Sequence, residues 1–468
     1  MLNHCRPFLL TATAAFATVV LAGCGGSGSG GGMSTGGACS ATKQKQFVLD
    51  ATREWYLFDD LLPASVSIGN FTTAQDLLDA LTATARAQGK DRFFSYLTTP
   101  AADSSFLQEG QFIGFGLRVS IQGNQLFLPD VYEGSPASEG GLTRGDEIIA
   151  VDSGSGYVAM ATILATDPNL EQAFGPSTEG VQRGFRIRHW NGQTPADVIL
   201  TKRVVTIAPV PIAGGTAVLT LPSNPSVQVG YINLRTFIST AAAPLRSAFA
   251  QFRALGIQNL IVDFRYNGGG LVSVAELVGD LHGANRAAND IYSRTRFNAR
   301  KAANDSIRRF QAQPESVAPV RIAFITTGGT ASASELVINS MKSWAEVAIV
   351  GADTYGKPVG QSAFDLNGCD FRLRLITFRT TNANNEGDYF DGLASTLAFA
   401  CAAADDLGRA PGDGSESSTA AALAWLGTGA CGQVMGIPSA PFQKAQVTAR
   451  LPLPRVMAPA QGYLPGLY

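Results

Sequence analysis

The feature that most constrains this 468-residue chain is a strand, a glycine turn and a helix that follow one another between residues 321 and 344. Residues 321–327 have the apolar pattern of a short buried strand and lead directly into the turn Gly328-Gly329-Thr330-Ala331-Ser332. Apolar residues then recur at three- and four-residue steps, which predicts a helix. Because the first N–H groups of a helix lack intrahelical partners, Ser332 stands beside anion donors of the kind that acyl transfer needs.

A second strand is predicted over residues 347–350, and the loop after it carries Lys357. In a parallel α/β sheet, the loops after both strands emerge at the carboxyl edge, where such folds bind ligands. The order of the elements therefore predicts that Ser332 and Lys357 meet.

Two other interpretations apply to these loops. Ser332 and Glu335 fit a helix capping box, in which Ser332 has only a structural role. Residues 351–357 reproduce most of a phosphate-binding loop, which would indicate a nucleotide-dependent enzyme. Pro358 argues against that class, because it replaces the magnesium-binding hydroxyl, lacks an N–H and disfavours a helical conformation at the preceding residue.

A third strand is predicted over residues 259–265, followed by the turn Tyr266-Asn267-Gly268-Gly269-Gly270 and a helix from about Leu271. This turn adds a second set of backbone N–H donors at the same sheet edge.

Together, the motifs D-F-R-Y-N-G-G-G, G-T-A-S-A-S-E and G-K-P-V-G-Q resemble those of the C-terminal processing peptidases, the tail-specific Ser/Lys proteases. The resemblance extends from about residue 55 to 425. It implies that Ser332 is the nucleophile, Lys357 the general base and Gln361 the residue that orients the lysine. It also implies an oxyanion hole made by the amides of Ala333 and of the 268–270 turn, Gly268 and Gly269 among them.

Ser334 is the alternative nucleophile, but two helical positions after Ser332 it should point about 200° away. The chain has only three histidines, His4, His189 and His282. We expect His4 to be removed with a leader and the contexts of His189 and His282 to indicate structural roles. The sequence therefore offers no good candidate for the histidine of a Ser-His-Asp triad. A lysine can replace histidine as the base only if burial lowers its pKa from about 10.4 towards about 7 to 8.

The composition excludes several other classes. A net charge of -2 and 15% charged residues do not indicate nucleic-acid binding. No cysteine pair has the C-x-x-C spacing of a zinc or redox site, and we expect neither a metal nor a cofactor. The oligomeric state cannot be read from the sequence.

The N-terminus has the pattern of a secretory signal, with Arg6 before the apolar run 8–21. Leu21-Ala22-Gly23-Cys24 resembles a bacterial lipobox, which implies cleavage before Cys24 and its lipidation. Residues 25–37 are mostly glycine and serine, as in a flexible tether. We therefore expect a lipoprotein of the bacterial cell envelope, anchored to the outer membrane and facing the periplasm. The alternatives are a plain signal peptide and an uncleaved anchor.

Residues 104–205 alternate short strands and turns in a succession that resembles a PDZ domain. In such a module, the loop Gly114-Phe115-Gly116-Leu117 would present N–H groups to the C-terminal carboxylate of a peptide, and the adjacent strand edge would pair with that peptide. The alternative is a small β-barrel that only spaces the other domains.

The resemblance and the composition together predict an α+β or α/β multidomain protein with a ClpP/crotonase-like catalytic core. We expect the chain to be divided into a signal peptide (1–23), a lipidated tether (24–38), an N-terminal helical domain (39–103), a PDZ-like domain (104–205), a Ser/Lys peptidase domain (206–435) and an extended tail (436–468). Within the peptidase domain, the polar stretch 285–316 is expected to be loop or helix.

Four cysteines remain beside Cys24 after removal of the signal, and an even count in an exported protein fits two disulfides with three possible pairings. We favour Cys401 with Cys431, and Cys39 with Cys369.

The function expected from these features is a serine endopeptidase with a Ser/Lys dyad that cleaves exported proteins or peptides and recognises their accessible C-terminal tails. The alternative is a catalytically inactive peptide-binding lipoprotein of the envelope.

Overall fold

The computed structural model describes residues 37, 39–193, 196–431, 449–452 and 458–468. The predicted signal peptide, Cys24 and all of the predicted tether except residue 37 lie outside the described residues. The described residues from Cys39 onward form one folded unit. In the described part of the chain, no helix combines the length and the apolar character that crossing a membrane requires.

The N-terminal part of this unit is helical, as predicted. Helices α1 (Ala41–Trp55) and α2 (Ala74–Ala87) pack on each other, and the short 3₁₀ turns Asp59–Leu61 and Ile68–Asn70 lie between them. Thr73 and Asp76 form a capping box at the start of α2. Strand β1 (Tyr96–Thr98) and helix α3 (Pro100–Glu109) complete the region.

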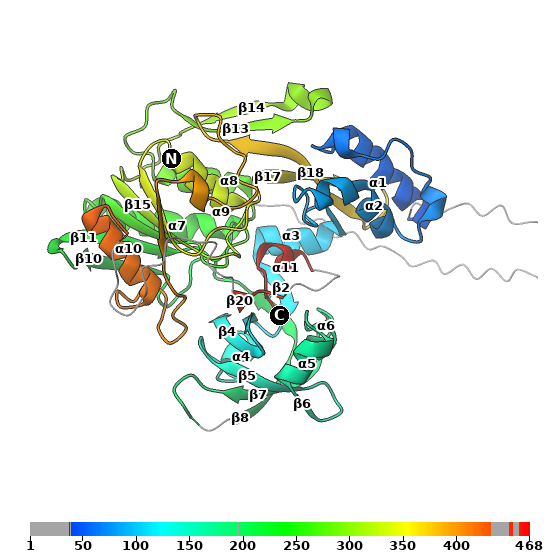
Figure 1. Cartoon of the computed structure of the whole chain (residues 1–468), viewed down its shortest axis with the longest axis horizontal. Helices are drawn as coiled ribbons and strands as arrows, with labels where there is room; N and C mark the ends of the chain where they lie inside the picture. The colour runs from blue at the N-terminus through cyan, green and yellow to red at the C-terminus, as the bar shows by residue number, and fades with distance from the viewer. Residues whose placement is uncertain (1–36, 38, 194–195, 432–448, 453–457) are drawn as a thin grey trace, which may run out of the picture. The chain divides into compact units, whose positions relative to one another are not determined.

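The helical region packs on a five-stranded sheet, visible beside α1 and α2 in Figure 1. Its central strand is β18 (Arg372–Thr381), which pairs with β1, β13 (Ile291–Phe297) and β17 (Val359–Asp365), while β14 (Ser306–Arg309) pairs with β13. The expectation of loop or helix over 285–316 is therefore wrong for β13 and β14. Only the 3₁₀ turn Ala299–Asn304, between these two strands, is helical.

A second β-rich region follows α3. Strands β2 (Gln111–Gly114) and β9 (Arg203–Thr206) pair at its base. A seven-stranded sheet has the order β20-β3-β4-β5-β7-β8, with β6 paired to β5. The elements of this region are β3 (Leu117–Gln122), β4 (Gln125–Val131), α4 (Pro136–Glu139), β5 (Glu147–Asp152), β6 (Tyr157–Ala159), α5 (Met160–Thr166), α6 (Glu171–Phe174), β7 (Gln182–Arg188), β8 (Ala196–Thr201) and, from the end of the chain, β20 (Ala449–Arg450).

The largest region is built on a six-stranded sheet with the order β10-β11-β12-β15-β16-β19. Neighbours from β11 to β19 are parallel, and only the edge strand β10 is antiparallel. The strands are β10 (Thr216–Leu221), β11 (Asn224–Asn233), β12 (Asn259–Asp263), β15 (Arg321–Thr326), β16 (Glu346–Gly351) and β19 (Phe399–Ala402).

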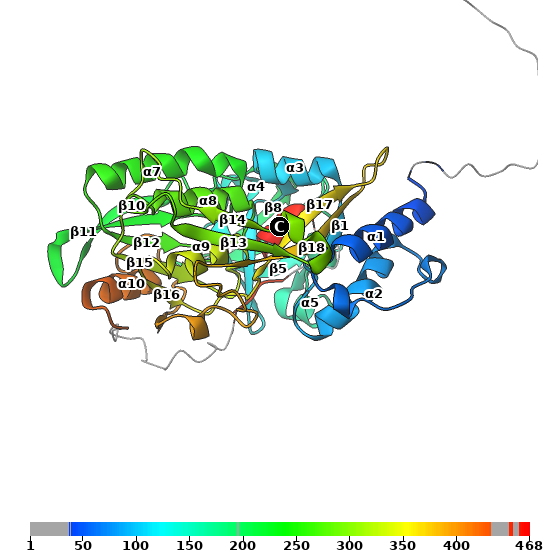
Figure 2. The same cartoon turned by 90° about the horizontal axis from the view of Figure 1, so that it is seen from above.

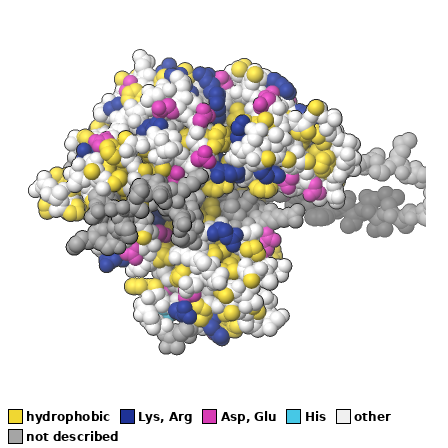
Figure 3. All heavy atoms as spheres, viewed as in Figure 1, with side chains coloured by type: hydrophobic (Ala, Val, Ile, Leu, Met, Phe, Trp, Pro, Cys, Tyr) yellow, Lys and Arg dark blue, Asp and Glu magenta, His cyan; other side chains and the backbone are white. Residues whose placement is uncertain are grey.

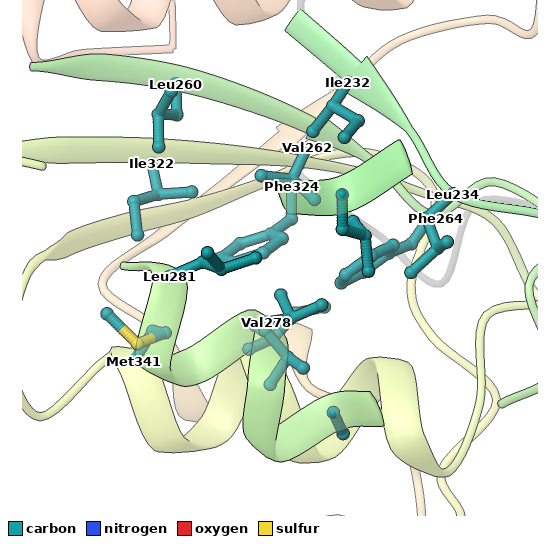
Figure 4. Close-up of a cluster of buried hydrophobic side chains, with 14 of the residues drawn as sticks. Ile232, Leu234, Leu260, Val262, Phe264, Val278, Leu281, Ile322, Phe324 and Met341 are labelled. Atoms are coloured by element: carbon teal, nitrogen blue, oxygen red, sulfur yellow. The ribbon is translucent and has the colours of Figure 1, made fainter. Parts of the chain in front are cut away.

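Helices cover both faces of this sheet because successive side chains of each strand point to opposite faces. Leu260, Val262, Ile322 and Phe324 pack against the helices α7 (Ala242–Ala254), α8 (Val272–Leu281) and α9 (Ala333–Met341). The close-up in Figure 4 shows these strand residues facing Val278, Leu281 and Met341. Ile261, Ala323 and Val350 instead pack against α10 (Ser417–Thr428), and Figure 2 shows α7 and α10 on opposite sides of the strands.

Both favoured disulfides are present, Cys39–Cys369 and Cys401–Cys431. The expectation of an extended tail does not fit residues 458–468. They contain helix α11 (Pro459–Tyr463), and they bury Leu464, Leu467 and Tyr468. The stretch 436–448 lies outside the described residues. On the face drawn in Figure 3, side chains of both charges are interspersed and no large patch of one sign is seen.

Candidate active site

Ser332 lies between β15 and α9, at the turn that the sequence singled out. Its backbone has φ 57° and ψ -112°, a region that residues other than glycine rarely adopt. Such strain persists only where the surrounding structure holds it, and it is concentrated at functional sites. Ser332 is partly exposed, whereas the helix residues that follow it are buried.

Glu335 connects the serine loop to the lysine loop. Its carboxylate accepts hydrogen bonds from the N–H groups of Ser332 (2.8 Å), Gly356 (2.7 Å) and Lys357 (2.8 Å). Complete burial raises the pKa of Glu335, although these hydrogen bonds act in the opposite direction. The bond from the Ser332 amide is one half of the predicted capping box, but the other two bonds give Glu335 a further role, since they fix Lys357 relative to Ser332.

Lys357 lies in the loop between β16 and β17, as predicted. β15 and β16 pair in parallel up to Thr326 and Gly351, so both loops leave the same sheet edge. The Tyr355 N–H also donates to the Thr330 carbonyl (2.8 Å). Burial lowers the pKa of Lys357 to about 8, against the opposing effects of Asp91 and Glu335. A lysine with this pKa has a sizeable neutral fraction near neutral pH and can accept a proton.

The N-terminal helical region forms part of the lysine environment. The Lys357 Nζ lies 4.7 Å from the centroid of the Phe94 ring. Asp91, which is fully buried, accepts a hydrogen bond from the Phe94 N–H (2.8 Å). Arg92 donates to the carbonyls of Tyr355 and Gly356, within the lysine loop. Sequence reasoning missed these residues, because nothing in their local pattern indicates that they contact a loop more than 260 residues later.

The side-chain amide of Gln361 donates to the backbone carbonyl of Phe94. Gln361 lies on β17, four residues after Lys357. The hydrogen bond therefore connects it to the residue whose ring faces the lysine. A role in orienting Lys357 would then act through Phe94.

The 266–270 turn lies directly against Ser332. Asn267 accepts a hydrogen bond from the Ala331 N–H on its carbonyl (2.9 Å). A Cβ on Gly269 would lie 2.8 Å from the Ser332 Cβ and 3.0 Å from the Ala333 nitrogen, so only glycine fits there. Ala333 is the first residue of α9, where an N–H has no partner within the helix.

Gly268 and Gly269 were predicted to contribute N–H groups to the oxyanion hole, and in this structure both N–H groups donate hydrogen bonds within the protein. The Gly269 N–H donates to the Asn267 side chain (2.9 Å), and the Gly268 N–H donates to the carbonyl of Tyr463 (2.9 Å). The bond from Gly269 lies within the turn, whereas the acceptor of the Gly268 bond, Tyr463, belongs to a distant part of the chain.

Ser334 is fully buried, and its hydroxyl donates to the Asn267 carbonyl (2.9 Å). It therefore connects α9 to the glycine turn. His282 is also buried, and its Nδ1 contacts the Val278 carbonyl (2.6 Å), while His189 contacts Asp146 (3.0 Å). The contacts of Ser334, His189 and His282 are therefore typical of structural residues.

Beneath the turn, Arg265 is buried among carboxylates. It contacts Asp263 (2.9 Å), Glu416 (2.9 Å) and Asp405 (3.0 Å). These ion pairs connect the end of β12 to the start of α10. They fix the strand end from which the glycine turn departs.

The predicted peptide-binding loop lies between β2 and β3. Phe115 is fully buried, and its ring packs on Phe185 with centroids 5.1 Å apart. The N–H groups of Gly116 and Leu117 donate to the backbone oxygen of Tyr468, at 3.0 and 3.1 Å. Gly114 ends β2, where a Cβ would lie 2.9 Å from the Tyr468 carbonyl carbon. Among the residues that the structure describes, no cluster of His, Cys, Asp and Glu could hold a metal ion.

Comparisons with known proteins agree with this architecture. Residues 228–392 match the model of peptidase family S41, and residues 43–96 match that of the peptidase S41 N-terminal domain. The chain thus contains domains of peptidase family S41, and the predicted family resemblance is confirmed.

Two curated relatives are processing proteases. The carboxyl-terminal-processing protease of Synechocystis sp. is 28% identical over 274 residues, which cover 58% of this chain and 59% of that protein. The chloroplastic C-terminal processing peptidase of Tetradesmus obliquus is 30% identical over 289 residues, which cover 58% of this chain and 57% of that protein. The matches thus span less than two thirds of either relative.

A solved structure supports the fold as a whole. The crystal structure of a putative S41 protease from Bacteroides fragilis NCTC 9343 superposes with a TM-score of 0.63 over 81% of this chain and 97% of that one. The sequence identity is 21%, so this likeness concerns the fold.

Proposed function

We propose that the protein is an endopeptidase that uses Ser332 as the nucleophile and Lys357 as the general base. The observation that carries this proposal is the Glu335 carboxylate, which holds the amides of both residues and so fixes a strained serine near a buried lysine. The lysine has the lowered pKa that a base requires.

In the first step, the neutral Lys357 amine takes the proton of the Ser332 hydroxyl while the Ser332 Oγ bonds to the peptide carbonyl carbon. The lysine ammonium then gives this proton to the leaving nitrogen as the C–N bond breaks. A water molecule, deprotonated by the same lysine, then bonds to the acyl carbon. The bond from this carbon to the Ser332 Oγ breaks, and the lysine ammonium returns the proton to the Ser332 Oγ.

The negative charge that develops on the substrate oxygen would be stabilised by the Ala333 N–H at the start of α9. The Gly268 N–H is the second donor in this proposal. It can act only after the Tyr463 carbonyl has left it.

The substrates would be exported proteins or peptides with accessible C-terminal tails. The names of the relatives and the resemblance of residues 104–205 to a PDZ domain support this specificity. The lipobox-like Cys24 supports a membrane anchor on the outer membrane, facing the periplasm. Replacing Cys24 with serine should release the protein from the membrane fraction, and unchanged fractionation would contradict the lipid anchor.

The alternative is a peptide-binding lipoprotein without turnover. Such a protein would need neither a strained Ser332 nor a buried lysine with a lowered pKa. Nothing in the arrangement of the site favours it.

The decisive experiment measures cleavage of unstructured peptides by mass spectrometry. Ser332→Ala should abolish cleavage and leave the fold intact, because it removes only the attacking oxygen. Ser334→Ala is the matched control, and it should retain cleavage with a modest loss of stability, since it removes one buried hydrogen bond worth about 1 kcal/mol. An active Ser332→Ala variant would disprove the assignment.

A further inference from the structure

Residues 466–468, which follow helix α11 in the segment 458–468, lie along the edge of β3 as an added strand. The Val119 N–H donates to the Gly466 carbonyl (2.8 Å), and the Tyr468 N–H donates to the Leu117 carbonyl (2.9 Å). The bonds from Gly116 and Leu117 to the Tyr468 oxygen extend this pairing into the loop. Strand addition at an open sheet edge, with loop amides at its end, is a recurring mode of peptide recognition.

The side chain of Tyr468 fills a built pocket. Only 4% of Tyr468 is exposed, and its ring lies 4.7 Å from that of Phe174. Its hydroxyl donates to the Asn169 carbonyl (2.5 Å). Leu170, Phe115 and Phe185 belong to the same apolar cluster. The pocket is therefore lined by apolar side chains and has one hydrogen-bond acceptor, the Asn169 carbonyl, placed to accept the hydroxyl of a tyrosine.

The same segment contacts the candidate active site. The Tyr463 carbonyl accepts the Gly268 N–H, and the Tyr463 ring stacks on Phe106 with centroids 5.6 Å apart. Gly268 precedes Gly269, the residue that touches Ser332. We call the edge of β3 together with the pocket of Tyr468 the β3 groove. The eleven residues 458–468 thus fill the β3 groove and also hydrogen-bond the Gly268 amide, which the proposed mechanism needs.

We propose that residues 458–468 are a built-in ligand of the β3 groove, which keeps the enzyme at rest until a substrate tail with a similar end displaces it. The proposal rests on the proposed peptidase function for its effect on turnover, but not for its effect on binding. It also defines the preferred tail, which has an apolar residue followed by a tyrosine.

A segment of the same chain competes strongly because its effective concentration can reach the millimolar range. An added peptide must overcome this competition, so its apparent affinity is lower than its affinity for an empty groove. Weakening the docked segment should therefore strengthen the binding of an added peptide.

The test measures fluorescence anisotropy of a labelled peptide with the sequence of residues 459–468, Pro-Ala-Gln-Gly-Tyr-Leu-Pro-Gly-Leu-Tyr, and a free carboxylate. The full chain with Ser332→Ala is compared with the same chain that also carries Leu467→Ala and Tyr468→Ala. We expect binding to become tighter by roughly tenfold or more. The control is Ile212→Ala, which changes a side chain that is 83% exposed. Equal affinities of the folded proteins would overturn the proposal.

A second measurement needs no change in the segment. Amide hydrogen exchange of the Ser332→Ala chain should become faster at Tyr468 and at Gly268 when the peptide is saturating, because the Tyr468 N–H loses the Leu117 carbonyl and the Gly268 N–H loses the Tyr463 carbonyl. Unchanged exchange at saturation would overturn the proposal. A peptide ending in alanine should bind more weakly, and equal binding would overturn the assigned tyrosine preference.

The anisotropy and hydrogen-exchange measurements do not require hydrolysis, so they test the built-in ligand separately from the peptidase mechanism. If wild-type protein cleaves no peptide but the binding shift is found, only the peptidase mechanism fails. If cleavage depends on Ser332 but the changes Leu467→Ala and Tyr468→Ala leave the affinity for the added peptide unchanged, only the built-in ligand fails.

Discussion

Lys357 and Lys202 are both buried lysines, one at the candidate active site and one in the β-rich region. Burial lowers the pKa of each to about 8. The Nζ of each also lies near a phenylalanine ring, at 4.7 Å from Phe94 and 5.0 Å from Phe115. The two lysines are thus nearly identical in the properties by which a catalytic base is usually recognised.

They differ in their partners. Lys202 donates hydrogen bonds to the carbonyls of Gly175 (2.8 Å) and Pro176 (2.9 Å), where it connects two loops. Among the described residues, the Lys357 Nζ donates no hydrogen bond, and its loop is connected through Glu335 to Ser332. A lowered pKa therefore identifies a buried lysine, whereas its neighbours determine whether it can serve as a base.

The largest difference should appear in catalysis. Lys357→Met should reduce kcat by about 10² to 10⁴, the range for losing a general base. Lys357→Arg should be no more active, because a guanidinium does not deprotonate. Lys202→Met is the matched control and should leave kcat unchanged. A comparable loss of kcat in both methionine variants would show that the distinction is wrong.

The pH dependence of cleavage should follow Lys357 alone. Below the pKa of about 8, kcat should fall by about tenfold per pH unit, because only the neutral amine accepts the serine proton. Above that pH, kcat should level off. The profile of Lys202→Met should coincide with that of the wild type, and an inflection that moves in this variant would assign the titration to the wrong lysine.

Stability should depend on pH through both lysines. Between about 8 and the ordinary value of 10.5, the unfolded chain binds a proton that the folded chain has released, so the free energy of unfolding rises with pH. In each methionine variant, the contribution of the replaced lysine to this increase in the free energy of unfolding should be lost. That contribution is at most about 1.4 kcal/mol per pH unit. Denaturant unfolding at several pH values, compared with the wild type, measures it. A pH-independent difference for either variant would contradict its lowered pKa.

The smallest expected effect comes from the aromatic ring beside the catalytic lysine. Phe94→Leu removes a cation–π contact that favours the charged amine and is worth about 0.5 kcal/mol at an exposed site and about 2 kcal/mol at a desolvated one. The inflection of the rate profile should therefore move to lower pH by about 1.5 units at most. A shift to higher pH would mean that the ring acts mainly by excluding water.

Local pattern was sufficient to predict the core of the site. Ser332 and Lys357 follow successive strands of a parallel sheet, and that topology brings their loops together whatever the surrounding side chains are. The glycine turn could be placed beside them for the same reason. The role of Glu335 was underestimated, because a capping box predicts its bond to Ser332 but not its bonds to the amides of Gly356 and Lys357.

Other parts depend on partners that are distant in sequence. Asp91, Arg92 and Phe94 carry no motif, and they matter only because the helical region packs on β17 and β18. β13 and β14 were missed because polar residues interrupt the apolar ones in both strands and most of β14 is exposed, so neither short strand has a continuous apolar pattern. The docking of Tyr468 could not be predicted either, since it depends on the edge of β3, more than three hundred residues earlier in the chain.

The order of the two disulfides has a consequence for how the protein matures. Along the chain, Cys39 is joined to the next cysteine, Cys369, and Cys401 is joined to the next one, Cys431. When a polypeptide enters an oxidising compartment from its N-terminus, each bond can form between cysteines in their order of arrival. Correct pairing then requires an oxidant but no reshuffling of incorrect bonds. Trapping free thiols while the newly made chain is oxidised should detect no other pairings as intermediates.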